Sequence, residues 1–127
     1  MIILREAADT DRNFITGTWT RGARFSNEYF KAMDSDAYYA LHAKLMVGLA
    51  NTSKIIIACL QAEPDVIIGY AIGSELVLHW LYVKPAFRKA GIARTLASQF
   101  PNIKFITGYS RSGMEIANKY NWVLIPI

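Results

Sequence analysis

The residues whose types and spacing could do chemistry lie in one segment near the middle of the chain. The segment reads as a β-strand, a loop of small residues and the start of a helix, and it runs Leu81-Tyr82-Val83-Lys84-Pro85-Ala86-Phe87-Arg88-Lys89-Ala90-Gly91-Ile92-Ala93-Arg94. Small residues let a ligand approach the backbone, and the free N–H groups of a first helical turn attract an anion. Four cations lie in the same segment. The pattern therefore favours a phosphate or pyrophosphate ligand.

Two common phosphate loops are excluded, because the chain contains neither G-x-x-x-x-G-K-[ST] nor G-x-G-x-x-G. The segment instead resembles the coenzyme A loop of the GNAT superfamily of N-acetyltransferases. The family pattern [QR]-x-x-G-x-[GA] is matched by residues 88–93, and a preceding L-x-V-x-P phrase is matched by residues 81–85. The resemblance extends to the order of the predicted elements over nearly the whole chain, while its specific part is confined to residues 79–97.

The resemblance implies that acetyl-CoA is the cofactor and lies between the fourth and fifth strands. The backbone of Leu81, Tyr82 and Val83 would bind its pantetheine arm. The backbone N–H groups of the loop would hold the pyrophosphate, with added charge from Arg88 and Lys89; they belong to Lys89, Ala90, Gly91, Ile92, Ala93 and Arg94. A primary amine of a small molecule or protein would attack the thioester directly, and an N–H near Leu81 would stabilise the oxyanion.

The general base predicted from the residues is His79, whose imidazole titrates near neutrality. Strand alternation places Val77, His79, Leu81 and Val83 on one face, and Leu78, Trp80 and Tyr82 on the other. The family often has a carboxylate at the position of Val77, which this chain lacks. Glu75 is the alternative base, and a half-buried structural histidine is the alternative interpretation of His79.

The general acid is predicted to be Tyr120, with Tyr109 as an alternative. The family's tyrosine position corresponds to Ala117, and its cofactor-contacting asparagine corresponds to Arg111. These departures leave open that the thiolate departs unassisted, or that the domain is a catalytically weak or inactive CoA-binding module of the same fold. The resemblance implies that the acceptor site forms from the first two helices and their loop, residues 19–39, where aromatic and acidic side chains occur together. A solvated helix face above an aromatic core is the alternative interpretation of this stretch.

The elements that must position these residues follow the order β-α-α-β-β-β-α-β-α-β. Strands are predicted at 2–7, at 54–60, 66–72 and 75–83 as an antiparallel meander, at 103–109 and at 122–127. Helices are predicted after Asp9, after Ser26 to about Gly48, around residues 92–100, and from Ser112 to about Asn121. The strand–helix–strand run over residues 75–109 predicts parallel fourth and fifth strands. The fold class is therefore α/β (α+β), a GNAT-like mixed sheet of about six strands and four helices.

Length and composition indicate one domain, residues 1–127, because 127 residues with 53% hydrophobic content suit a single core. A lone cysteine, Cys59, excludes a disulfide-stapled scaffold. No membrane-length apolar stretch or signal peptide is present, so a cytoplasmic location is expected. The net charge of +4 comes from scattered residues, which disfavours a nucleic-acid partner. The apolar residues 122–127 suggest edge pairing in a homodimer.

Overall fold

The fold is a mixed six-stranded sheet, seen in a computed structural model that describes residues 1–108 and 110–125. The strands follow one another across the sheet in chain order: β1 (Ile2–Glu6), β2 (Lys54–Leu60), β3 (Ile67–Gly73), β4 (Val77–Val83), β5 (Phe105–Ile106) and β6 (Val123–Leu124). β1 to β4 are antiparallel, whereas β5 and β6 join in parallel. This confirms the predicted fold class and meander. The fifth and sixth strands are shorter than predicted.

Five α-helices lie in the described part of the chain, one more than predicted: α1 (Arg12–Phe25), α2 (Glu28–Ala32), α3 (Ser35–Thr52), α4 (Ile92–Ala97) and α5 (Arg111–Tyr120). Single 3₁₀ turns, η1 (Asp9–Asp11) and η2 (Pro85–Phe87), precede α1 and α4. The predicted helix from Ser26 to Gly48 is broken because Met33 is extended and Asp34 caps α3 through the N–H of Ala37.

Helix caps differ from the predicted ones by one or two residues at three places. Asp11, rather than Asp9, occupies the N-cap position of α1. Asn27, rather than Ser26, caps α2 by accepting from two backbone N–H groups. Ser110, rather than Ser112, caps α5 by accepting from the N–H of Gly113. Each replacement is another short polar side chain of the kind that favours a cap, so local sequence located the helix starts only approximately.

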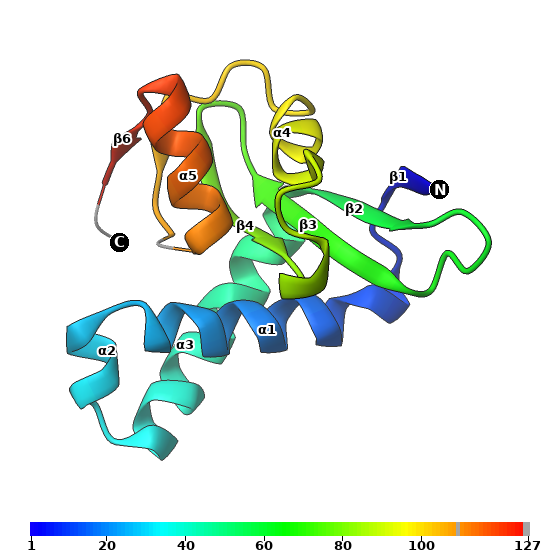
Figure 1. The fold of residues 1–127 in the computed structure, drawn as a ribbon. Helices are drawn as coiled ribbons and strands as arrows, with labels where there is room; N and C mark the ends of the chain where they lie inside the picture. Colours follow the sequence, from blue (N-terminus) through cyan, green and yellow to red (C-terminus); the bar gives the residue numbers. More distant parts are fainter. Residues whose placement is uncertain (109, 126–127) are drawn as a thin grey trace.

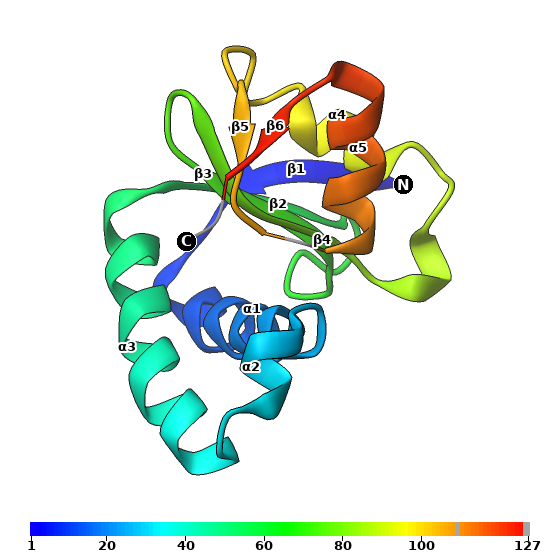
Figure 2. The same cartoon turned by 90° about the vertical axis from the view of Figure 1, so that its left-hand side faces the viewer.

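The helices cover both faces of the sheet, as Figures 1 and 2 show: α1 and α3 lie on one face, and α4 and α5 on the other. Each face has its own apolar core. Ile57, Tyr70 and Trp80 pack toward α1 and α3, while Ala58, Leu78, Leu81 and the α4–α5 pair form the second core. β2 is buried on both faces, as its continuous apolar run predicts.

A β-bulge in β4 changes which side chains share a face. Ile72 pairs with Trp80, but the next residue, Gly73, pairs with Leu78, so His79 is the extra residue on β4. Consequently Leu78 joins the core of Leu81 and Val83. The predicted strict alternation, with His79 on the same face as Leu81, is therefore wrong, because a bulge inserts one residue and shifts the pleat.

Asp11 anchors the start of α1 to β1. Its carboxylate accepts two hydrogen bonds from Arg5, at 2.7 and 3.0 Å, and one from the Ala8 N–H at 2.8 Å. The bond from Arg5 lowers the pKa of this buried carboxyl despite the opposing effect of burial. The carboxylate therefore contributes stability above about pH 4, which is lost as pH falls through the lowered pKa.

Asp11→Asn is expected to reduce the free energy of unfolding by about 2 kcal/mol at pH 7, because a buried charged bond is lost. Urea denaturation at several pH values measures this. The difference between wild type and variant should shrink as pH falls below the usual carboxyl pKa of 3.8. A difference that stays constant down to pH 2 would contradict the role of the ion pair.

Two further predictions concern membrane association and pairing of the last strand with a second copy of the chain. Among residues 1–108 and 110–125, no helix has the length and apolar character needed to cross a membrane. β6 lies at the edge of the sheet and Val123 is 56% exposed. Edge pairing with a second copy stays a prediction, and residues 126–127 of the predicted last strand lie outside the described residues.

Candidate functional site

The free edge of β4 lies where β4 and β5 separate. The two strands pair at only two positions, Val77 with Phe105 and Leu78 with Ile106. Lys84 donates to the carbonyl of Ile68 on β3, and the regular register from there places Tyr82 and Trp80 in hydrogen-bonded pairs with β3. The N–H and C=O groups of Leu81 and Val83 therefore point away from β3, toward the side of β4 that β5 no longer covers after Leu78.

The carbonyls on this edge are used by the protein itself. The Ser110 hydroxyl donates to the Leu81 carbonyl, and the Arg88 Nε donates to the Val83 carbonyl at 3.0 Å. The first bond attaches the start of α5 to β4, and the second folds the loop back over the end of the strand. Both contacts confirm the direction of the edge. Within the described part of the chain, the N–H groups of Leu81 and Val83 have no backbone partner, so they are the groups that this edge presents to a ligand.

The loop after β4 adopts the backbone conformation that an anion cradle requires. Lys89 and Gly91 have left-handed φ values of 68° and 81°. Gly91 is the N-cap of α4, and a Cβ built on it would meet nothing within 4 Å. The N–H groups of the first α4 turn, from Ile92 onward, have no partner within the helix. The N–H groups of Ile92, Ala93 and Arg94 are thus the backbone donors available beside Gly91, because the first intrahelical bond is made by the N–H of Thr95.

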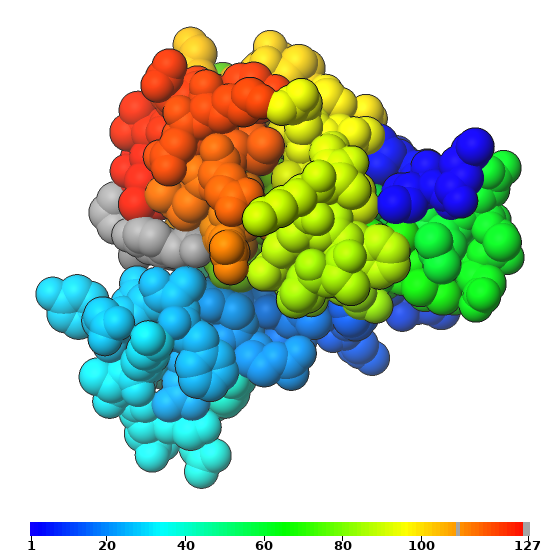
Figure 3. All heavy atoms as spheres, viewed as in Figure 1, coloured from blue at the N-terminus to red at the C-terminus, as the bar shows by residue number. Residues whose placement is uncertain are grey.

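A cavity of about 270 Å³ lies between this loop and α5. Figure 3 shows segment 85–94 (yellow-green) and the start of α5 (orange) facing each other on the front of the molecule. The cavity is lined by four cations and one carboxylate, which are Arg88, Lys89, Arg94, Lys119 and Glu115. The carboxylate also pairs with Arg111 at 3.6 Å. The charge excess favours a polyanionic ligand.

His79 lies on the opposite side of β4, against α1. Its ring stacks on Trp19 with centroids 6.2 Å apart, and its Nδ1 lies 3.3 Å from the Thr107 hydroxyl. That hydroxyl also reaches the His79 carbonyl, at 3.5 Å. When the hydroxyl donates to this carbonyl, its oxygen can accept Nδ1–H, and Nε2 is then the basic nitrogen.

Burial lowers the pKa of His79 below its ordinary value of 6.5, because the charged imidazolium loses solvation. The ring is therefore neutral at pH 7, which is the form that a general base needs. The lowered pKa thus suits His79 to the role of a base, although its face was predicted wrongly.

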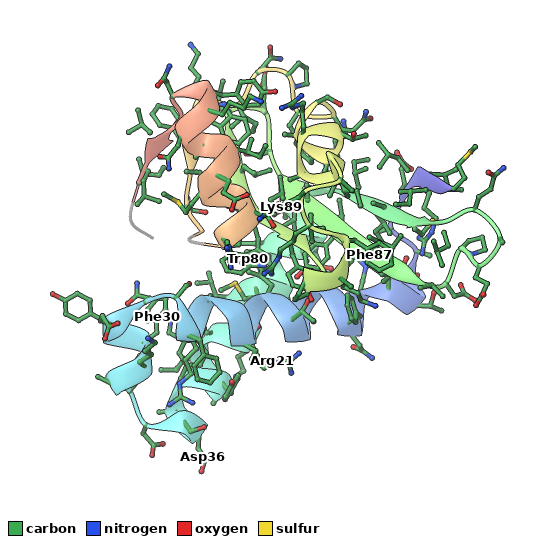
Figure 4. The ribbon with its side chains drawn as sticks, viewed as in Figure 1. Arg21, Phe30, Asp36, Trp80, Phe87 and Lys89 are labelled. Atoms are coloured by element: carbon green, nitrogen blue, oxygen red, sulfur yellow. The ribbon has the colours of Figure 1, made fainter. Side chains whose placement is uncertain are left out.

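A second cavity, of about 360 Å³, lies beside His79 between the sheet and the first three helices. Trp80 forms part of its wall and is wedged between two glycines: a Cβ on Gly22 would lie 2.7 Å from its ring, and Gly108 also faces it. Figure 4 shows Trp80 just above α1 and Phe30 beside α2. This cavity adjoins the partners of His79, since Trp19 and Thr107 both line it.

The predicted acceptor stretch, residues 19–39, supplies only part of this cavity. Trp19, Ala23 and Phe30 line it, but no acidic residue of the stretch does; Asp34 is occupied as a helix cap. The cavity also uses His42 from α3 and Thr107 after β5, which sequence reasoning missed. No spacing signal marks these residues, because they come from separate elements that meet only in the folded chain.

Tyr120 is not brought to either cavity. It is the last residue of α5, it is 46% exposed, and its ring packs on Trp122 with centroids 5.8 Å apart. α5 starts near α1 and runs away from it, so Tyr120 lies at the far end (Figures 1 and 2). The alternative acid, Tyr109, lies outside the described residues. Glu75, the alternative base, is exposed before β4 begins and lines neither cavity.

Comparison with known proteins gives structural but not sequence matches. No protein-family model matches the sequence, and no curated protein matches it. A candidate acetyl transferase from Pyrococcus furiosus superposes with a TM-score of 0.71 at 11% identity, covering 100% of this chain and 96% of that one. A predicted acetyltransferase from Clostridium acetobutylicum, solved with acetyl-CoA, superposes with a TM-score of 0.63 at 20% identity. The match covers 94% of this chain and 88% of that one.

A third match is yncA from Salmonella typhimurium, a candidate acetyltransferase solved with its cofactor acetyl-CoA. It gives a TM-score of 0.55 at 18% identity, covering 95% of this chain and 78% of that one. At these identities the likeness concerns the fold. The resemblance seen in the loop sequence is thus confirmed at the level of architecture: the chain has the fold of the GNAT acetyltransferases.

Proposed function

We propose that the protein is an N-acetyltransferase that moves the acetyl group of acetyl-CoA to a primary amine. One observation carries the proposal: the outward N–H groups of β4 lie next to a cationic loop with two left-handed residues, on a GNAT fold. The loop N–H groups and cations fit a diphosphate. The β4 edge fits an extended amide-containing arm, which would bind as an added strand.

The chemistry needs few groups from the protein. The amine nitrogen forms a bond to the acetyl carbon, the carbon–sulfur bond breaks, and coenzyme A leaves as its thiol. The Leu81 N–H is proposed to stabilise the negative charge that develops on the thioester oxygen. His79 Nε2 is proposed to accept the proton that the amine loses, directly or through one water. Orientation of the two reactants supplies much of the remaining acceleration.

The proton for the departing sulfur has no assigned donor in this proposal, because the geometry favours a structural role for Tyr120. Tyr120→Phe is expected to change turnover by less than twofold, since the hydroxyl lines neither cavity. Steady-state thiol release with the best amine measures this. A tenfold fall in turnover with unchanged acetyl-CoA affinity would restore Tyr120 as the acid.

Thermal melting with and without acetyl-CoA tests the proposal most directly. A ligand at 100 times its Kd that binds only the folded state is expected to raise the Tm by about 10 °C for a chain of this size. Thiol release with a panel of primary amines then tests transfer. No shift at millimolar acetyl-CoA would reject the proposal, and a shift without release to any amine would favour the alternative of a CoA-binding module.

A further inference from the structure

The cavity that Trp19 and Thr107 line next to His79 has mainly apolar and aromatic walls. Its lining among the described residues includes no Asp, Glu, Lys or Arg, and its polar members include Ser26, Asn27, His42 and Thr107. Its walls include Trp19, Phe30, Leu45, Met46 and Trp80. Its volume of about 360 Å³ lies in the lower part of the usual range for small-molecule sites, about 300–1,000 Å³. The cavity therefore suits one small, largely apolar molecule.

The missing charges restrict the acceptor further. An amino acid would bring a carboxylate, and a polyamine a second ammonium, into this space. Either group would lose its hydration without an opposite charge to replace it, which is costly. The amine nitrogen is an exception, because its proton is proposed to pass to His79, which contacts the lining residues Trp19 and Thr107. The body of the acceptor is therefore uncharged.

His42 lines the cavity from α3 and can supply a hydrogen-bond acceptor. Its Nδ1 lies 3.2 Å from the Tyr38 carbonyl on its own helix. A carbonyl oxygen only accepts, so in the neutral ring the proton is on Nδ1, and Nε2 carries the lone pair. The ring is held between Tyr38, with centroids 4.3 Å apart, and Phe30, with centroids 4.5 Å apart. Its Nε2 edge is turned away from the α3 backbone.

We infer that the acceptor is an arylalkyl primary amine whose ring carries a hydrogen-bond donor such as a phenol hydroxyl. This rests on the proposed acetyltransferase function. The ring occupies the space between Trp80 and Phe30, the donor binds His42 Nε2, and the amine lies beside His79. Transfer forms the amide C–N bond, breaks the thioester C–S bond, and passes the amine proton through His79 to solvent.

The test compares tyramine with phenethylamine, tyrosine and spermidine, using thiol release from acetyl-CoA. Wild-type kcat/KM is expected to be about tenfold higher for tyramine than for phenethylamine, and at least 100-fold lower for tyrosine and spermidine. His42→Phe, which keeps ring stacking, should bring the ratio of tyramine to phenethylamine close to one. His42→Gln, which keeps an acceptor, should restore part of the ratio, and circular dichroism checks that both variants fold.

Tyramine binding without acetyl-CoA, followed by calorimetry, separates this inference from the function on which it rests. If tyramine binds but acetyl-CoA neither raises the Tm nor releases thiol, the acetyltransferase proposal fails and the assignment of the cavity stands. If thiol is released but spermidine or tyrosine is preferred, the substrate class is wrong and the acetyltransferase stands. A tyramine preference that survives in His42→Phe would overturn the role of His42.

Discussion

Replacing Gly91 with aspartate is expected to lower the affinity for acetyl-CoA at least 100-fold. The new carboxylate enters the open space at the α4 start, beside the loop N–H groups and the cations that are proposed to hold the diphosphate. Two like charges 4 Å apart repel by about 4 kcal/mol near a protein surface, and salt screening leaves a substantial part of this. Calorimetry or the acetyl-CoA-dependent Tm shift measures the loss.

Gly91→Asn is the matched control, because asparagine has the shape of aspartate without its charge. Both residues tolerate the left-handed φ of 81° better than other side chains do. Their strain on the fold should therefore be similar, on the order of 1 kcal/mol. We expect the asparagine variant to keep most of the affinity. Equal losses in both variants would show that backbone strain, and not charge, is responsible, and would count against an anion site at Gly91.

His79→Gln is expected to lower turnover by a factor of 10² to 10⁴ while the affinity for acetyl-CoA stays within twofold. His79 contacts Trp19 and Thr107, which line the 360 Å³ cavity, and it lies on the opposite side of β4 from the cationic loop, so the two ligand sites are separable. Glutamine keeps a polar group that can bond Thr107 but cannot act as a base. Turnover in His79→Gln equal to that of wild type would remove His79 from the mechanism.

The pH dependence supplies an independent readout for His79. Because burial lowers its pKa below 6.5, kcat at saturating amine should fall with a midpoint below pH 6.5, as the ring becomes protonated. In kcat/KM, deprotonation of the free amine adds a separate limb at higher pH. The acid limb should disappear in His79→Gln. An unchanged acid limb in that variant would assign the titration to another group.

The sequence by itself determined the elements whose signal is local. The three-strand meander follows from apolar runs separated by turn residues, and the loop of residues 88–93 follows from a glycine and cations after a strand. These features depend on neighbours within a few residues, so they could be predicted from spacing. The likeness in architecture to solved acetyltransferase structures confirms the predicted fold class, while the anion-binding role of the loop stays a prediction.

Only the tertiary structure decided the content of the site. The bulge at His79 depends on the register between β3 and β4, and it turned that side chain toward Trp19. The pairing of His79 with Thr107 joins residues 28 positions apart. His42 reaches the same cavity from a helix with no motif to mark it. Such contacts are set by packing between distant elements, whose free energy no local pattern of residues encodes.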